Sequence, residues 1–381
     1  MSETPLDPAD WFPADYETSR ARFRADCAKA ITGPEDYCRA WPVASNADPD
    51  LTIDHAFFSG GGDRLLVLQS GIHGSEAASG AAVAAFVMNT YLPALLAKGI
   101  DVAFIHSLNP YGFKFCRRTD EDNVNLNRNF SADGSVFKIV NNDYRALRAV
   151  FEPQGKPESV AIATVREDLV FFAGLAQSGF KTKALMDGLD NGQYEFAEGL
   201  NYGGTGPQAQ TRFLREEIGP LLRKPYKKIW FLDYHTGLGD DGVLSIILGL
   251  KPAPGPMAEL TALFSGQDAN GIAIKTPSSP GFFATFGDVI DFVPTLAADP
   301  DRVLAVTMEY GTLGTDAISE LKSATRMILE NQAFFNGCEK PEVYQEIVED
   351  FRELFNPSDL GWRGKVLREA DLVFRTLLDK F

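Results

Sequence analysis

Residues 65–86 read LLVLQSGIHGSEAASGAAVAAF. The apolar run Leu65–Leu68 predicts a buried strand, and the alanine-rich segment Ala77–Leu96 has the composition of a helix. Between them, the glycines at positions 71 and 74 indicate a tight connection. A buried strand that leads directly into a helix is typical of α/β proteins, so this stretch indicates the fold class.

The same alternation extends on both sides of this stretch. Before it, Leu51–Phe58 alternates in polarity, and a glycine turn at 60–62 predicts a hairpin into the strand at 65–68. After it, apolar runs predict further buried strands, and helical patterns lie between or after them. These runs are 101–106, 228–233, 243–250 and 303–308. We therefore expect an α/β sheet covered on both faces by helices.

We expect one domain across residues 1–381, because neither an internal repeat nor a low-complexity linker interrupts the chain. Its middle is elaborated by a helical insertion at about 131–202. A strongly helical pattern also predicts a C-terminal extension at about 340–381.

Composition restricts the possible partners. Lys and Arg number 36 against 52 Asp and Glu, a net charge of −16, which argues against nucleic acid and anionic membranes as partners. An anionic substrate would have to be attracted by a few local Arg or Lys side chains. The chain has no apolar run near the roughly 20 residues needed to span a bilayer, and its start is acidic. With four scattered cysteines, these features predict a cytoplasmic protein.

Two of the four histidines follow predicted buried strands. His73 and Glu76 form an H-x-x-E motif at a helix start, and His235 lies in DYHTG. Two imidazoles and one carboxylate are the ligands of a catalytic zinc, which keeps one position open. Taken singly, each motif has an ordinary structural explanation: Glu76 near the positive end of a helix, and His235 as a hydrogen-bonded strand-end residue beside Asp233.

Two further segments carry polar groups of interest. In NLNRNF, residues 125–130, Asn127 and Arg128 could form a carboxylate clamp, whereas most such loops are only solvated and charge-balanced. Glu309 ends the apolar run VLAVTM, where it could face solvent or act as a general base.

Together, these blocks resemble the zinc carboxypeptidase family and the related succinylglutamate desuccinylase and aspartoacylase group. The blocks HGSE, NLNRNF, DYHTG and MEYGT occur in that family's order, within residues 65–130 and 228–312. The resemblance implies a three-layer α/β/α fold with a mixed, mostly parallel central sheet. It also implies a hydrolase, of an uncharacterised bacterial branch.

The resemblance further implies a metal site. His73, Glu76 and His235 would bind one Zn²⁺ per chain, and Glu309 would take a proton from the attacking water and pass it to the leaving amine.

It also implies substrate contacts. Arg118 matches the arginine that stabilises the developing oxyanion, and its neighbour Arg117 is an alternative that spacing does not separate. Asn127 and Arg128 match the pair that holds the substrate's free carboxylate. Tyr202 and Tyr310 are candidates for a tyrosine near the substrate amide, or are packing residues.

The expected partner is a small peptide or an N-acyl amino acid with a free carboxylate. A metallopeptidase is preferred over an N-acyl-amino-acid deacylase, because the aspartoacylase group has a β-rich C-terminal domain and the chain after Gly311 looks helical. A non-catalytic protein that binds zinc or carboxylates is the remoter alternative.

One motif is rejected. Residues 237–242, GLGDDG, fit the dinucleotide fingerprint G-x-G-x-x-G, but an apolar strand follows where that fingerprint needs a helix. This segment instead predicts a hairpin turn between two strands.

Overall fold

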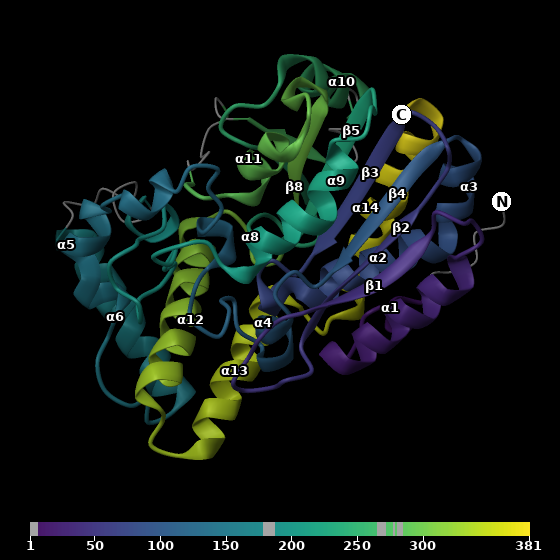
Figure 1. Cartoon of the computed structure of the whole chain (residues 1–381). Coiled ribbons are helices and arrows are strands. Elements are labelled where there is room, and N and C mark those ends of the chain that lie inside the picture. Colours follow the sequence, from purple (N-terminus) through teal and green to yellow (C-terminus); the bar gives the residue numbers. More distant parts are fainter. Residues whose placement is uncertain (1–6, 178–186, 265–271, 277–278, 280–284) are drawn as a thin grey trace.

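One eight-stranded sheet runs through the computed structural model, which describes residues 7–177, 187–264, 272–276, 279 and 285–381 (Figure 1). The strands follow the order β1-β2-β4-β3-β5-β8-β6-β7. Their bounds are β1 Tyr37–Pro42, β2 Thr52–Phe58, β3 Arg64–Ser70, β4 Ile100–His106, β5 Lys228–Gly237, β6 Leu244–Leu248, β7 Ala273–Lys275 and β8 Val303–Gly311.

The central strands of the sheet are parallel. β3 pairs with β4 and β5, and β5 pairs with β8, all in parallel. Antiparallel pairs join β1 to β2, β2 to β4 and β6 to β8, and β7 is parallel to β6. The mixed, mostly parallel sheet is therefore confirmed. The two outer strands β1 and β7 had no clear apolar run and were not predicted.

Both predicted hairpins are wrong. β4 lies between β2 and β3, and β8 lies between β5 and β6, so neither pair of consecutive strands is hydrogen-bonded together. The glycines at 60–62 serve another purpose: a Cβ atom on Gly62 would lie 2.0 Å from the carbonyl oxygen of Gly99. The loop crosses close to the start of β4, and only a residue without a side chain fits there.

Helices cover both faces of the sheet. Leu66 and Leu68 of β3 point into one apolar layer, and the alternate residues Leu65 and Val67 point into the other. The first layer contains α1 Tyr16–Ala30, α2 Ala77–Thr90, α10 Pro254–Phe264 and α14 Leu360–Lys380. The second contains α8 Ala209–Phe213, α9 Gly219–Leu222 and α11 Val289–Phe292. The three-layer α/β/α arrangement is thus confirmed.

A further group of helices packs beside the sheet (Figure 1). It consists of α5 Asn142–Phe151, α6 Val160–Gln177, α12 Ala317–Asn336 and α13 Pro341–Phe355. The shorter helices α3 Leu92–Ala97 and α4 Pro110–Phe115 flank β4. Among the described residues, every helix is too short or too polar to cross a membrane.

Candidate active site

The candidate site lies where three neighbouring parallel strands end. His73 and Glu76 follow β3, His235 is near the end of β5, and Glu309 is near the end of β8. His235 and Glu309 are direct cross-strand partners. Carboxyl ends of parallel strands share one edge of a sheet, and this explains why residues more than 200 positions apart meet.

The loop after β3 is shaped by two glycines. Gly71 has a φ of +68°, which disfavours any side chain. A Cβ atom on Gly74 would lie 1.9 Å from the backbone carbon of Gly112, so the loop packs directly on α4. The turn Gly74–Glu76 then leads into α2, and both His73 and Glu76 are buried.

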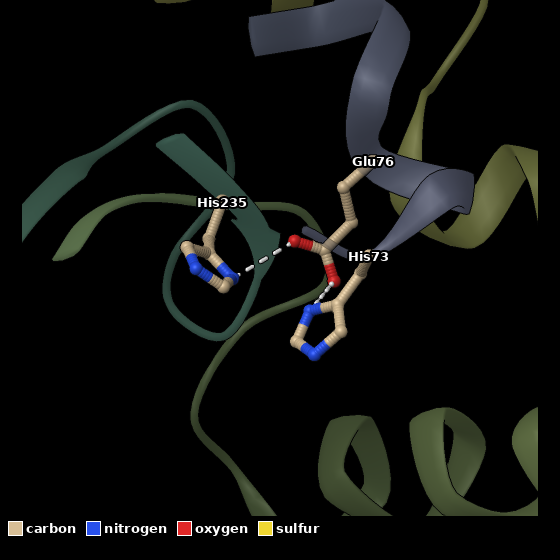
Figure 2. A group of neighbouring side chains, drawn as sticks. All are labelled: His73, Glu76 and His235. Atoms are coloured by element: carbon tan, nitrogen blue, oxygen red, sulfur yellow. Dashed lines mark hydrogen bonds and ion pairs between the residues drawn. The ribbon is translucent and has the colours of Figure 1, made fainter. Parts of the chain in front are cut away.

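Three side chains converge in this loop region (Figure 2). The Nδ1 atom of His73 is 2.9 Å from Oε1 of Glu76, and Nδ1 of His235 is 3.2 Å from Oε2 of the same carboxylate. One potential ligand atom from each residue lies within 4.8 Å of the others. The arrangement has the donor types and the spacing of a metal site with two imidazoles and one carboxylate.

The outer nitrogens of both imidazoles are held by other residues. Nε2 of His235 is 2.7 Å from Asp233, whose other oxygen accepts a hydrogen bond from Gln69. Nε2 of His73 is 3.0 Å from Oδ1 of Asn125. Such outer partners orient a ligating histidine and select its tautomer. Asn125 was missed by the sequence analysis, although it begins the NLNRNF segment two residues before the predicted clamp.

These contacts test whether a cation fits. Oδ1 of Asn125 also accepts the backbone N–H of Asn127, so this atom is an acceptor and His73 must donate from Nε2. Burial, assisted by the charge of Arg118, lowers the pKa of His73 to about 3 and keeps the ring neutral. A lone pair on Nδ1 then faces the Glu76 carboxylate at 2.9 Å. A cation between these atoms would turn this repulsion into two bonds, so the residues fit a metal ion.

The pKa values of the other two members of the cluster, Glu76 and His235, are shifted in opposite directions. Burial opposes ionisation of Glu76, but the hydrogen bond from Nδ1 of His235 holds the pKa of Glu76 well below its ordinary value. Burial likewise opposes the charged form of His235, but the carboxylate of Asp233 raises the pKa of His235 well above its ordinary value. The cluster therefore keeps one carboxylate ionised in the interior.

Glu309 lies beside this cluster without belonging to it. Its Oε1 accepts the backbone N–H of Leu238 at 2.8 Å. Burial, reinforced by the negative charge of Glu76, raises the pKa of Glu309 to about 7. A carboxyl group with a pKa near neutrality can both accept and return a proton.

A cavity of about 230 Å³ opens over the cluster and contains two guanidinium groups. Arg118 donates from Nη1 to Oε1 of Glu76 at 2.8 Å. Arg128 is buried and donates to two backbone oxygens, those of Asp190 and Asn127, both at 2.8 Å. Among the described residues, Arg128 has no ion pair. The apolar side chains of the wall include Leu189, Ile247, Leu248, Leu250, Ile290 and Leu313.

Comparison with known proteins places the chain in a family. The profile described as "Protein of unknown function (DUF2817)" matches residues 12–369. The chain belongs to the DUF2817 family. No curated protein matches it in sequence.

Several solved structures are similar to this DUF2817 protein. Carboxypeptidase A from Helicoverpa armigera is 13% identical with a TM-score of 0.48, over 89% of this chain and 73% of that one. Bovine thrombin-activatable fibrinolysis inhibitor, in complex with tick carboxypeptidase inhibitor, is 14% identical with a TM-score of 0.45, over 94% and 97%. A succinylglutamate desuccinylase from Silicibacter sp. TM1040 is 13% identical with a TM-score of 0.38, over 81% and 69%.

Three of the predicted site residues lie away from the cavity of this DUF2817 protein. Arg117 is buried against α12, with Nε 3.0 Å from Glu330. Tyr310 alternates with Glu309 along β8, faces the opposite layer and stacks on Tyr234. Tyr202 is buried in a loop, where its carbonyl oxygen accepts the backbone N–H of Asn125.

Asn127 lines the cavity, but both ends of its side chain are already used. Its Oδ1 accepts the backbone N–H of Val289 at 2.9 Å, and its Nδ2 donates to Asp288 at 3.2 Å. Asn127 thereby ties the loop that carries Arg128 to the start of α11.

That loop is also held by a buried carboxyl group. Oδ1 of Asp120 accepts the backbone N–H groups of Asp122 and Val124, at 3.0 and 2.8 Å. Burial raises the pKa of Asp120 to about 7. Between about pH 4 and pH 7, unfolding therefore releases a proton from Asp120, and the contribution of this group to the free energy of unfolding falls as the pH rises.

Replacing Asp120 with asparagine is expected to stabilise the protein more at pH 8 than at pH 5. The amide oxygen can accept the same two hydrogen bonds, and the variant has no buried charge at high pH. We expect the Tm at pH 8 to rise by about 2 °C or more, measured by calorimetry. Asp122→Asn, at an exposed neighbour, is the matched control. An equal Tm change for Asp120→Asn at both pH values would contradict the expectation.

Proposed function

We propose that this protein is a zinc-dependent hydrolase that cleaves an amide bond next to a free carboxylate, as a metallocarboxypeptidase does. One observation carries the proposal: the convergent His73, Glu76 and His235 share a cavity with the buried guanidinium of Arg128, which forms no ion pair with any residue that the structure describes. A site of this kind combines a cation-binding cluster with a receptor for one anionic group.

The metal ligands in this proposal are Nδ1 of His73, the carboxylate of Glu76 and Nδ1 of His235, with one Zn²⁺ per chain. When bound, the ion would supply a Lewis acid that polarises the scissile carbonyl. Asp233 and Asn125 would hold the two imidazoles in the ligating tautomer.

Glu309 is the proposed general base and acid. Its Oε1 is held by the backbone of Leu238, so the carboxyl group is fixed at the cavity wall. It would remove a proton from the attacking water and later deliver this proton to the leaving nitrogen.

Two arginines would bind the substrate. Arg128 would hold the free carboxylate, since a buried guanidinium with no carboxylate in direct contact among the described residues favours an anion, although Asp288 and Asp190 lie near enough to share its charge. Asn127 would form the wall beside this contact and keep Arg128 in place. Arg118 would stabilise the negative charge that develops on the carbonyl oxygen. We prefer Arg118 to Arg117 because Arg118 lines the cavity, whereas Arg117 is buried beside Glu330 and is not part of the cavity lining.

A peptide substrate is preferred over an N-acyl amino acid. Residues 312–381, all of which are described, contain α12, α13 and α14 and no strand. The β-rich C-terminal domain of the aspartoacylase group therefore has no counterpart in this part of the chain. Hydrolysis of N-acyl amino acids, without hydrolysis of peptides, would support the deacylase alternative.

Metal analysis tests the proposal. The purified protein, after incubation with zinc and removal of excess, is expected to contain about one zinc per chain. Chelation should abolish hydrolysis of peptides with a free carboxylate, and zinc should restore it. His235→Ala should bind no zinc, whereas a surface variant, Glu346→Gln, should bind the usual amount. A folded protein that binds no zinc would refute the proposal.

A further inference from the structure

A chain of hydrogen bonds runs from His73 to the wall of the cavity. Nε2 of His73 lies 3.0 Å from Oδ1 of Asn125, and Nδ2 of Asn125 donates to Oδ1 of Asn201 at 2.6 Å. Nδ2 of Asn201 in turn donates to the carbonyl oxygen of Leu189 at 2.8 Å, and Leu189 lines the cavity. All four residues are buried, so these hydrogen bonds are shielded from solvent.

Two backbone groups fix the direction of this chain. The N–H of Asn127 can only donate, and it points at Oδ1 of Asn125 at 3.0 Å. The carbonyl of Leu189 can only accept, so Asn201 must present its NH2 group there and its oxygen to Asn125. Every bond therefore donates in the same direction, from the imidazole toward the carbonyl oxygen of Leu189. Hydrogen bonds aligned in this way polarise and strengthen one another.

The backbone of Asn201 is fixed on both sides. Its φ is +49°, in the left-handed region that glycine and asparagine adopt most readily. Its carbonyl oxygen accepts the backbone N–H of Gln193 at 3.1 Å. The carbonyl oxygen of the next residue, Tyr202, accepts the backbone N–H of Asn125 at 2.7 Å. Asn201 is therefore anchored beside Asn125, which places its side chain between Asn125 and Leu189.

We propose that Asn201 is a positioning residue for His73. It holds the amide of Asn125 with its oxygen toward the imidazole. This orientation selects the tautomer of His73 that carries its proton on Nε2 and leaves the lone pair of Nδ1 free for a metal ion. Asn201 acts through Asn125 and is not itself a ligand.

Removing the side chain of Asn201 should weaken this selection. The amide of Asn125 would then keep only the N–H of Asn127 as a fixed partner, and it could turn to present its NH2 group to the ring. A ring that faces a donor at Nε2 carries its proton on Nδ1, the nitrogen that would bind zinc. The role of Nδ1 as a ligand rests on the proposed function, whereas the tautomer of His73 can be measured without any metal.

Asn123 offers a matched comparison. It is also a buried asparagine in the left-handed region, with a φ of +59°, and its Nδ2 donates to the carbonyl oxygens of Ala197 and Gly199 at 2.9 and 3.0 Å. Its Oδ1 accepts from Arg117 at 2.8 Å, so this branch leads away from His73. Replacing either asparagine with glycine suits the backbone conformation and removes buried hydrogen bonds. A difference between the two variants at His73 would therefore report positioning and not general stability.

Nitrogen NMR of the metal-free full chain, labelled at histidine, tests the proposal. The chain has four histidines, and the signals of His73 are identified by their loss in His73→Gln. We expect His73 to be protonated on Nε2 in the wild type and in Asn123→Gly, and to show a substantial share of the Nδ1-protonated tautomer in Asn201→Gly. A wild-type His73 protonated on Nδ1, or an unchanged tautomer in Asn201→Gly, would overturn the proposal. The wild-type spectrum can do so even if a variant fails to fold.

Zinc affinity, measured by competition with a chromophoric chelator, gives a second readout. Losing an outer partner of a ligating histidine costs about 10–100-fold in metal affinity, so Asn201→Gly should bind zinc about 10-fold more weakly than the wild type. Asn123→Gly should bind zinc as the wild type does, and equal losses in both variants would leave Asn201 a merely structural role. A wild type that binds no zinc would refute the proposed hydrolase, while the tautomer measurement would still decide the role of Asn201.

Discussion

Replacing Glu309 with glutamine is expected to lower kcat by about 10³-fold while the protein still binds zinc. Glutamine has the same shape, and its amide oxygen can still accept the N–H of Leu238. It cannot accept a proton from water at neutral pH, and general acid–base groups contribute about 10²–10⁴-fold to rates. The measurements are steady-state kinetics on a peptide with a free carboxylate and zinc content of the same preparation.

The Glu309 experiment has a matched control. Glu346→Gln makes the same substitution at an exposed position of α13 and should leave kcat unchanged. A loss of kcat in Glu309→Gln together with loss of zinc would indicate a disrupted site. Full turnover by a zinc-loaded Glu309→Gln protein would refute Glu309 as the base.

Replacing Arg128 with methionine is expected to reduce kcat/KM by about 10²–10³-fold for substrates with a free carboxylate. Removing one partner of a buried charge pair costs about 2–5 kcal/mol, and Arg128 is buried in the cavity wall. The loss should appear mainly in KM, since a distal carboxylate is bound equally in the ground state and the transition state. Amidated versions of the same peptides should be affected far less.

Two controls separate recognition from folding in the Arg128 experiment. Arg128→Lys keeps a cation without the planar fork and should recover part of the lost affinity. Arg212→Met, at an exposed arginine of α8, should behave as the wild type. Equal losses on free and amidated peptides would show that Arg128 supports the loop and does not bind the carboxylate.

The members of the candidate metal cluster could be predicted from the sequence because each lies just after a segment with a clear local pattern. His73 and His235 each follow a short apolar run and have glycines nearby. Parallel strands then bring the carboxyl ends of both runs together. The partners of the outer nitrogens were harder to find. Asn125 lies in a polar loop with several similar side chains, and only the loop's folded path selects which of them meets His73.

Arg117 and Arg118 show a limit of the same kind. The two are adjacent in the chain and chemically identical, so no sequence pattern ranks them. Cys116, just before them, ends α4 with its backbone in the left-handed conformation. In the loop that follows, Arg117 points toward Glu330 and Arg118 points toward Glu76. Tyr310 is separated from Glu309 for a different reason: neighbouring residues of a strand face opposite sides of the sheet.

The order of the strands was decided only by the tertiary structure. Local polarity predicted strands at 51–58, 65–68, 228–233 and 303–308, and strands lie there, because burial on the two faces of a sheet requires apolar side chains at those positions. No local signal says which strand lies beside which, since backbone hydrogen bonds between strands are nearly independent of side-chain identity. β4 could therefore lie between β2 and β3, and β8 between β5 and β6, although each of these pairs is consecutive in the chain. Helix packing over the whole sheet selected that order.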